Sequence, residues 1–213
     1  MNKAKVILIA ILLLMFSTAV FAQGITGKGV KVGLNLANWT GDDADFSGEL
    51  GEKKMRTGFV FGGFITYEIN ETFSLQPEVY YSMMGVKYEG SMEGEDFTMT
   101  FKTDYIQIPI LAKFNLSKEN NVKPNIFIGP ALGINLNAKY EMEAFGQSTE
   151  GDMEDLEMDV KSTDFGLVFG AGVNFGKISV DARYNLGLST IPDTEEDVDI
   201  KNSVISIMLG YSF

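Results

Sequence analysis

The sequence VISIMLGYSF, residues 204–213, indicates the fold because its side chains alternate between two kinds with a period of two residues. One set is large and apolar: Ile205, Ile207, Leu209, Tyr211 and Phe213. The other set is smaller or more polar on average: Val204, Ser206, Met208, Gly210 and Ser212. Successive side chains of a β-strand point to opposite sides of the sheet, so this pattern predicts a strand with two different faces.

Seven earlier stretches alternate in the same way, which gives eight predicted strands in all. They cover residues 30–37, 58–67, 73–83, 105–114, 125–136, 164–174 and 178–188. The connections near 39–56, 86–100, 141–161 and 189–200 are long, polar and acidic, whereas those near 69–72, 115–123 and 175–177 are shorter. An even number of strands, with long loops at one end and short turns at the other, predicts an all-β, eight-stranded, antiparallel up-and-down transmembrane β-barrel. Both termini then lie at the short-turn, periplasmic end.

The small residues indicate which face of the strands points into the barrel. Nine of them share the face that carries Glu78, Lys113, Asp181 and Arg183: Gly58, Gly62, Gly129, Ala131, Gly133, Gly166, Gly170, Gly172 and Gly187. Glycine weakens a strand on a solvent face, but inside a narrow barrel it leaves room for long charged side chains. We therefore expect the large apolar face to meet lipid. The alternative is a soluble ligand-binding barrel of the lipocalin type, with the apolar face inside.

The N-terminus predicts export. Lys3 and Lys5 precede an apolar run from Val6 to Phe16, and small residues then lead to a cleavage site between Ala22 and Gln23. That run is shorter than the roughly 20 residues needed for a helical membrane span. We expect residues 1–22 to be a cleavable signal peptide and residues 23–213 to form one barrel domain.

Composition excludes several functions. The chain has 17 basic and 29 acidic residues, and removal of Lys3 and Lys5 would leave 15 against 29. Such an acidic chain is not expected to bind nucleic acid, because that affinity comes largely from Lys and Arg at phosphates. The chain has no His and no Cys, which excludes His-dependent and Cys-dependent nucleophilic catalysis. We predict that the protein is not an enzyme and has no cofactor.

The acidic loops also invite a calcium interpretation. Residues 43–48, DADFSG, resemble the opening of an EF-hand loop, but Lys54 stands at the twelfth position, where a bidentate Glu is required. We therefore predict no metal site. Weak divalent-ion bridging between the acidic loops and lipopolysaccharide is the sharper alternative to a merely solvated acidic surface.

Several segments together resemble the outer-membrane β-barrel family of Bacteroidetes that is often called PorT-like. They are GVKVGLNLANW, FSLQPEVYYSMMG, DYIQIPILAKFNL, PNIFIGPALGINL, DFGLVFGAGV and SVDARYNLGLS. The resemblance implies the outer membrane of a Gram-negative envelope, contact with its lipid and lipopolysaccharide, and insertion by the barrel assembly machinery. Leu209, Tyr211 and Phe213 are similar to the C-terminal signal which that machinery recognises. The resemblance includes Pro77, Pro109 and Pro130, where we expect bulges or local register breaks because proline cannot donate to a ladder.

Polar side chains on the inward face form the candidate site. They are Glu68, Gln76, Glu78, Gln107, Lys113, Asp164, Asp181 and Arg183. They could line a polar passage, or they could pair and fill the lumen, since buried charges must be compensated. An eight-stranded barrel is just wide enough for side chains to fill it, which favours the filled lumen, with Arg183–Asp181, Arg183–Glu78 and Lys113–Glu78 as candidate pairs. We therefore predict a structural, adhesion or surface-interaction role through the long acidic loops. The alternative is a narrow transport or secretion-accessory barrel that works with envelope or secretion proteins.

Overall fold

The computed structural model describes residues 25–92, 94–117, 122–194 and 198–213. The predicted signal peptide, with Ala22 and Gln23 at its expected cleavage site, lies outside these residues. Among the described residues, no helix is both long and apolar enough to cross a membrane. The helices in this part of the chain are single turns, α2 (Ser47–Leu50) and the 3-10 helix η1 (Met153–Leu156).

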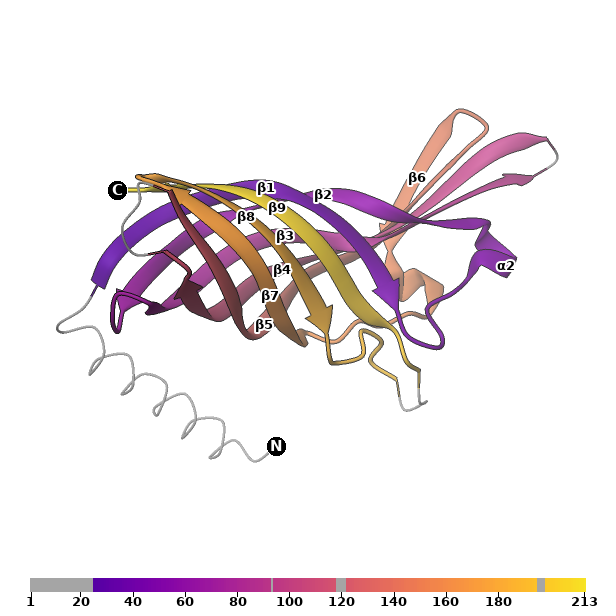
Figure 1. Ribbon diagram of the computed structural model, residues 1–213. Helices are drawn as coiled ribbons and strands as arrows, with labels where there is room; N and C mark the ends of the chain where they lie inside the picture. The colour runs from indigo at the N-terminus through magenta and orange to yellow at the C-terminus, as the bar shows by residue number, and fades with distance from the viewer. Residues whose placement is uncertain (1–24, 93, 118–121, 195–197) are drawn as a thin grey trace.

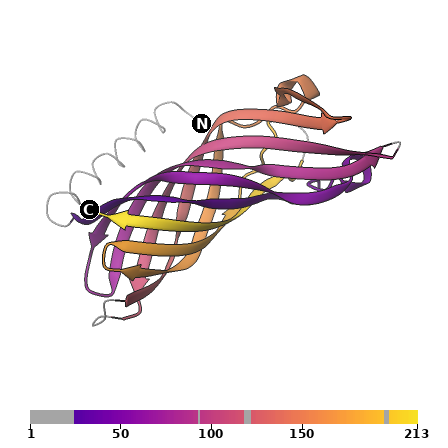
Figure 2. The same cartoon turned by 90° about the horizontal axis from the view of Figure 1, so that it is seen from above.

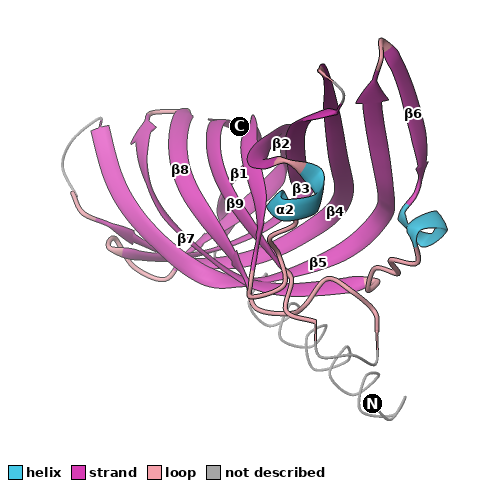
Figure 3. Ribbon diagram, turned by 90° about the vertical axis from the view of Figure 1, so that its right-hand side faces the viewer, coloured by secondary structure: helices cyan, strands magenta, loops and turns pink. Residues whose placement is uncertain are grey.

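Eight strands form a closed antiparallel ring. Figures 1 and 3 show how the strands curve around a common interior. Their bounds are β1 (Ile25–Thr40), β2 (Glu52–Glu68), β3 (Phe73–Met92), β4 (Glu95–Asn115), β5 (Val122–Ala144), β7 (Thr163–Phe175), β8 (Ile178–Gly187) and β9 (Lys201–Ser212). The order around the ring is β4-β3-β2-β1-β9-β8-β7-β5, and pairing of β4 with β5 closes it. The predicted eight-stranded antiparallel barrel is confirmed. A ninth strand, β6 (Gln147–Asp152), pairs only with the end of β5 and stands outside the ring.

The first and last strands lie side by side. Val30 of β1 is opposite Tyr211 of β9, and Leu34 is opposite Ile207. The start of β1 and the C-terminus therefore lie at the same end of the barrel, which we call the short-turn end (Figure 1). The opposite end, where β6 and α2 lie, is called the projecting end.

The inward and outward faces are those predicted from the small residues. Outward side chains are exposed, with Val32 at 54% and Ile207 at 60%, whereas Asn35 and Ser206 on the inward face are almost fully buried. An exposed apolar wall around a polar, glycine-rich interior is the pattern of a membrane barrel. A soluble barrel has the opposite arrangement.

Strands β2 to β5 continue well past the ends of their neighbours, as both Figure 1 and Figure 2 show. Residues 86–100, for which the sequence predicts a long loop, lie almost entirely in β3 and β4, so that prediction is wrong. The alternation continues there with reversed chemistry: Val86 and Tyr88 are buried inside, while Lys87 and Glu89 lie on the outer side. The reversal is explained by water, which replaces lipid outside this part of the sheet. These strands therefore lack the apolar outer face by which the other strands can be predicted from the sequence. The ends of β2 to β5 that extend beyond β1, β7, β8 and β9, together with β6, are called the projecting sheet.

The prolines are accommodated without the predicted bulges. Between β3 and β4, Pro77 is opposite Ile110 and Tyr80 is opposite Gln107, so the register is the same on both sides of an interruption. Between β4 and β5 the register likewise does not change from Pro109 to Ala112. The prolines donate no ladder bond, yet the register is kept. A slip of one residue would turn every following side chain to the wrong face, which explains why it does not occur. The register shifts lie elsewhere, between Ile25 and Gly27 in β1, between Met55 and Val60 in β2, and between Asp104 and Tyr105 in β4.

Candidate functional site

Four charged side chains meet in the middle of the lumen, and we call them the ionic cluster: Lys31 of β1, Glu78 of β3, and Asp181 and Arg183 of β8. Lys31 Nζ lies 2.9 Å from Glu78 Oε1 and 2.5 Å from Asp181 Oδ2. Arg183 closes the ring, with Nη1 2.7 Å from Glu78 Oε2 and Nη2 2.9 Å from Asp181 Oδ2. All four side chains are almost completely buried. Two cations and two carboxylates therefore compensate one another across the barrel, as buried charges must.

Glycine and aromatic residues make the space in which Arg183 lies. The guanidinium carbon stands 5.2 Å from the centre of the Phe127 ring and 5.6 Å from that of Tyr80, within the range of cation–π contacts. A Cβ atom on Gly170 would come within 2.7 Å of the Phe127 ring and 2.8 Å of the Arg183 Cα. Gly170 is thus required for the close approach of β7 to Phe127 and Arg183.

The structure brings together four of the eight lumen residues selected from the sequence. Glu78, Asp181 and Arg183 form the ionic cluster, and Gln76 donates a hydrogen bond from Nε2 to Glu78 Oε1. The candidate pairs of Arg183 with Asp181 and with Glu78 are both present. Lys31 was not selected, although its place between the outward residues Val30 and Val32 was the signal that could have found it.

Within the described ranges, the other four selected residues form no ion pair or hydrogen bond with the ionic cluster, although Lys113 lies beside it. Lys113 is buried, and its Nζ lies 5.7 Å from the centre of the Phe127 ring; its candidate pair with Glu78 is not formed. Asp164 accepts hydrogen bonds from Ser189 Oγ at 2.6 Å and Asn202 Nδ2 at 3.1 Å, nearer the projecting end. Gln107 is buried in the wall, and Glu68 is exposed at the short-turn end.

Apolar side chains fill the lumen next to the ionic cluster. One group consists of Val60, Tyr80 and Met208, and another of Leu111, Phe127, Ala131 and Val168. A further group, nearer the projecting end, consists of Ala37, Met84, Tyr105 and Val204. These side chains occupy the lumen both beside the charges and on their projecting side, so the polar side chains of the described residues do not form a continuous passage.

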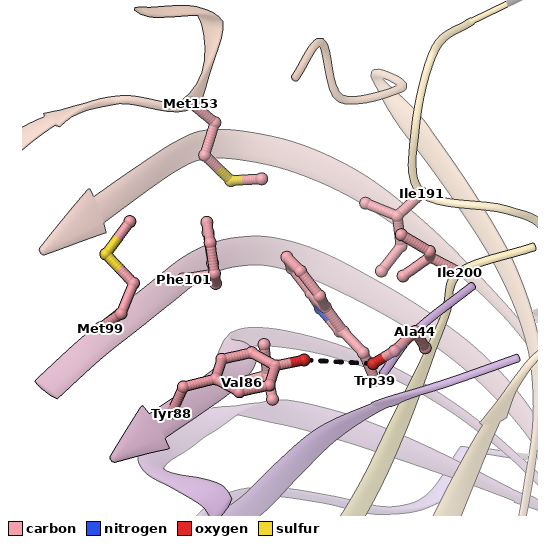
Figure 4. Close-up of a cluster of buried hydrophobic side chains, with 9 residues drawn as sticks. All are labelled: Trp39, Ala44, Val86, Tyr88, Met99, Phe101, Met153, Ile191 and Ile200. Atoms are coloured by element: carbon pink, nitrogen blue, oxygen red, sulfur yellow. Dashed lines mark hydrogen bonds between the residues drawn. The ribbon is translucent and has the colours of Figure 1, made fainter. Parts of the chain in front are cut away.

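A larger group of side chains, which we call the mouth cluster, closes the projecting end of the lumen (Figure 4). Its members are Trp39, Ala44, Val86, Tyr88, Met99, Phe101, Met153, Ile191 and Ile200. The rings of Trp39 and Phe101 are 5.2 Å apart, and Tyr88 donates a hydrogen bond from its hydroxyl to the Ala44 carbonyl at 3.1 Å. Because Met153 follows β6 and Ile191 follows β8, the long connections fold over the mouth and supply part of its seal.

At the short-turn end, in contrast, the described residues leave a recess. A cavity of about 750 Å³, which we call the vestibule, leads inward from the rim of the barrel. Thr66, Ser74 and Gln76 line its wall, Lys31 and Lys113 lie at its inner part, and Lys123 and Glu68 lie nearer its rim. The vestibule is therefore a polar recess that ends at the ionic cluster.

The outer face of the projecting sheet is charged. Lys54 is directly opposite Lys87, and Lys102 is directly opposite Lys139, an arrangement that alone would destabilise the sheet. Neighbouring glutamates compensate: Lys102 Nζ lies 2.7 Å from Glu141 Oε2, and Lys139 Nζ lies 3.0 Å from Glu150 Oε1. The hydrogen bond from Lys139, together with the charge of Lys102, lowers the pKa of the Glu150 carboxyl below its ordinary value.

The loop that resembles an EF-hand uses its carboxylates within the fold. Asp43 Oδ2 accepts a hydrogen bond from the Asp199 amide at 2.8 Å, and Asp45 Oδ1 accepts one from the Ser47 amide at 3.0 Å. The contacts of Asp45 with Ser47 lower the pKa of its carboxyl. Among the described residues, no group of three or more acidic side chains is gathered as a metal ion would need.

The three residues of the predicted assembly signal all point outward from β9. Leu209, Tyr211 and Phe213 are exposed, and the rings of Tyr211 and Phe213 lie 5.9 Å apart in an edge-to-face arrangement. The Phe213 amide donates a hydrogen bond to the Lys28 carbonyl at 2.9 Å, which ties the C-terminus to β1. Their recognition by the assembly machinery stays a prediction.

Comparison with known proteins identifies a family of the same architecture. A family model described as outer membrane protein beta-barrel domain matches residues 21–192. No curated protein matches the chain.

Several solved structures are similar over most of their length. Neisserial surface protein A is 18% identical, with 90% of this chain and 100% of that chain covered and a TM-score of 0.45. Ail, the attachment invasion locus protein of Yersinia pestis, solved with the heparin analogue sucrose octasulfate, is 18% identical, with 88% and 98% covered and a TM-score of 0.42. OprG from Pseudomonas aeruginosa is 11% identical, with 89% and 97% covered and a TM-score of 0.43. At such identities and scores, the likeness says nothing about ligands.

Proposed function

The chain belongs to the family of outer membrane protein beta-barrel domains, and from that premise we propose that it is a sealed, non-enzymatic barrel that acts through its projecting sheet and acidic loops. It is an outer-membrane protein, and its apolar wall meets the lipid of that membrane. In the proposed orientation, the short-turn end faces the periplasm and the projecting end faces the exterior, as is usual for such barrels.

The filled lumen is the observation that carries this proposal. The ionic cluster and the mouth cluster occupy the interior, so the described residues leave no open path for a solute between the two sides. The four charges of the ionic cluster are satisfied by one another, which is the arrangement of a packed core. A protein whose interior is occupied in this way acts through the surfaces that it presents outside the membrane.

The projecting sheet supplies such a surface. Its last strand, β6, pairs on one side only, and an unpaired strand edge is a template on which a partner can add a strand. Glu154 and Glu157, which follow β6, are exposed at this end, as is Glu49 in α2. Charge complementarity therefore favours a partner that presents basic side chains.

The experiment compares a deletion strain with strains that express the wild type or one of two variants. Glu154→Gln/Glu157→Gln removes two negative charges at the projecting end, and Glu68→Gln/Glu71→Gln removes two at the short-turn end as a matched control. Adherence to cells and to matrix-coated surfaces is measured for strains in which the barrel folds, as checked by heat-modifiable gel mobility. We expect the deletion and the first variant to adhere less, and the control variant to behave as the wild type.

Equal adherence of all four strains would contradict the proposal. Loss of protein secretion in the deletion strain, with adherence unchanged, would instead support a secretion-accessory role, which the PorT-like resemblance implies. Increased permeability of the envelope in the deletion strain alone would support a purely structural role.

A further inference from the structure

We propose that the vestibule is a binding site for a small anion that carries a carboxylate or phosphate group, with Lys113 as the residue that recognises it. The proposal concerns the opposite end of the barrel from the projecting sheet. It is therefore independent of the surface-interaction function.

The first step is the balance of buried charge at the inner end of the vestibule. The ionic cluster contains two cations and two carboxylates and is neutral as a group. Lys113 adds a third buried cation, only 5% exposed, to the same region. The acidic side chains Asp104 and Asp164 are bonded elsewhere, to Arg56 and to Ser189 and Asn202. This part of the lumen therefore holds one positive charge in excess.

The second step is that Lys113 forms no direct ion pair with a carboxylate of the described residues, although Asp181 and Glu78 lie near enough to act on its charge through space. Glu78 and Asp181 are the buried carboxylates nearest in the fold, and both already bind Lys31 and Arg183. The contact of Lys113 with the Phe127 ring stabilises the ammonium charge by only a fraction of the amount that a bonded carboxylate would. A buried ammonium without a counter-charge costs several kcal/mol, so the site favours an anion.

The third step is access. Lys113 lines the vestibule together with neutral hydrogen-bonding side chains, among them Thr66, Ser74, Asn174 and Ser179. Such groups can donate to the remaining oxygens of a carboxylate or phosphate and accept from its hydroxyl or amide groups. The rim carries charges of both signs, from Lys123 and from Glu68 and Glu71. Selection for a negatively charged ligand therefore comes from the buried Lys113.

The test uses the full barrel in lipid nanodiscs, with inorganic phosphate and acetate as separate probes and chloride at matched ionic strength as the reference. Binding is followed by the side-chain NMR signals of carbon- and nitrogen-labelled lysine. We expect a saturable shift of the Lys113 signals with at least one probe. Tighter binding of phosphate would indicate a phosphorylated ligand, and tighter binding of acetate a carboxylate.

Lys113→Met should weaken binding by about 10- to 100-fold, the value of one charge-assisted hydrogen bond. Lys177→Met is the matched control: it removes the same charge at the same end of the barrel, but Lys177 lies over the Tyr211 ring and outside the vestibule. Without an added anion, Lys113→Met should be at least as stable as the wild type, because it removes the excess charge.

Three results would overturn the proposal. One is an equal response to chloride, which would show screening only. Another is equal weakening of binding by the two variants. The third is that the NMR signals of wild-type Lys113 show a neutral amine or a direct bond to Asp181 Oδ1. A neutral amine would carry no excess charge, and a bond to Asp181 would compensate that charge within the protein. These wild-type signals decide the matter even if Lys113→Met fails to fold.

Discussion

Replacement of Glu78 by Gln tests the energetic role of the ionic cluster. The side chain is 1% exposed and accepts from Lys31 Nζ at 2.9 Å and from Arg183 Nη1 at 2.7 Å. Gln keeps the shape but removes the negative charge, so two buried cations are left with Asp181 alone. Removal of one partner from a buried ion pair costs about 3–5 kcal/mol, and we expect the free energy of unfolding to fall by that amount.

The measurement is reversible urea unfolding of the barrel refolded into lipid vesicles, followed by the fluorescence of Trp39 and by gel mobility. Glu68→Gln is the control, because Glu68 shares the inward face of its strand but is exposed and makes no ion pair within the described residues. It should change the free energy of unfolding by less than about 0.5 kcal/mol. Addition of Lys31→Met to Glu78→Gln should recover part of the loss, with a coupling energy of about 1–3 kcal/mol. A loss below about 1 kcal/mol for Glu78→Gln, or no coupling, would refute the view that these charges hold the lumen together.

Three further predictions concern the mouth cluster, the projecting sheet and the packing of the lumen. Trp39, the only tryptophan of the chain, should emit at shorter wavelength in the folded barrel and resist quenching by iodide; ready quenching would mean that the mouth cluster is open. Because the pKa of Glu150 is lowered in the fold, its contribution to the β5–β6 hairpin is present above the ordinary value of 4.5 and lost as pH falls through the lowered pKa. The protection factors of the hairpin amides against hydrogen exchange, corrected for the intrinsic rate at each pH, should fall only in that acidic range, and Glu150→Gln should abolish this dependence; an unchanged profile would contradict it. Gly170→Ala should cost about 1–3 kcal/mol by overpacking against Phe127, whereas Gly63→Ala, where an added Cβ meets only the Gly29 carbonyl at 3.4 Å, should be near neutral in the same unfolding assay.

The sequence predicts the barrel well because the alternation of its side chains follows the two environments on either side of each strand. Each strand inside the membrane has lipid on one side and a narrow lumen on the other, so Val32 and Asn35, or Ile207 and Ser206, differ in chemistry as well as in position. Beyond the membrane, water replaces lipid, and the same strands carry Lys87 and Thr100 outside with Val86 and Phe101 inside. Apolar outer faces end at that boundary, so the sequence pattern predicts loops where the projecting sheet lies.

Position on the inward face could be predicted, whereas the ion pairs could be predicted only in part: both pairs of Arg183 are present, but the pair of Lys113 with Glu78 is not. The face of Glu78, Asp181 and Arg183 follows from alternation alone. Their meeting with Lys31 depends on the register between β1, β3 and β8, which ladder bonds and closure of the ring determine. For the same reason, Lys113 was paired with Glu78 in the sequence analysis, while the structure gives both oxygens of Glu78 to other cations.

The central claim is that side chains seal the lumen, and conductance across planar lipid bilayers tests it most directly. Purified, correctly folded barrel should give no steady current at any moderate voltage, because the ionic cluster and the mouth cluster leave no continuous aqueous path. Regular, reproducible channel steps from the wild-type protein would contradict the account. They would move the function of this barrel from its surface to its interior.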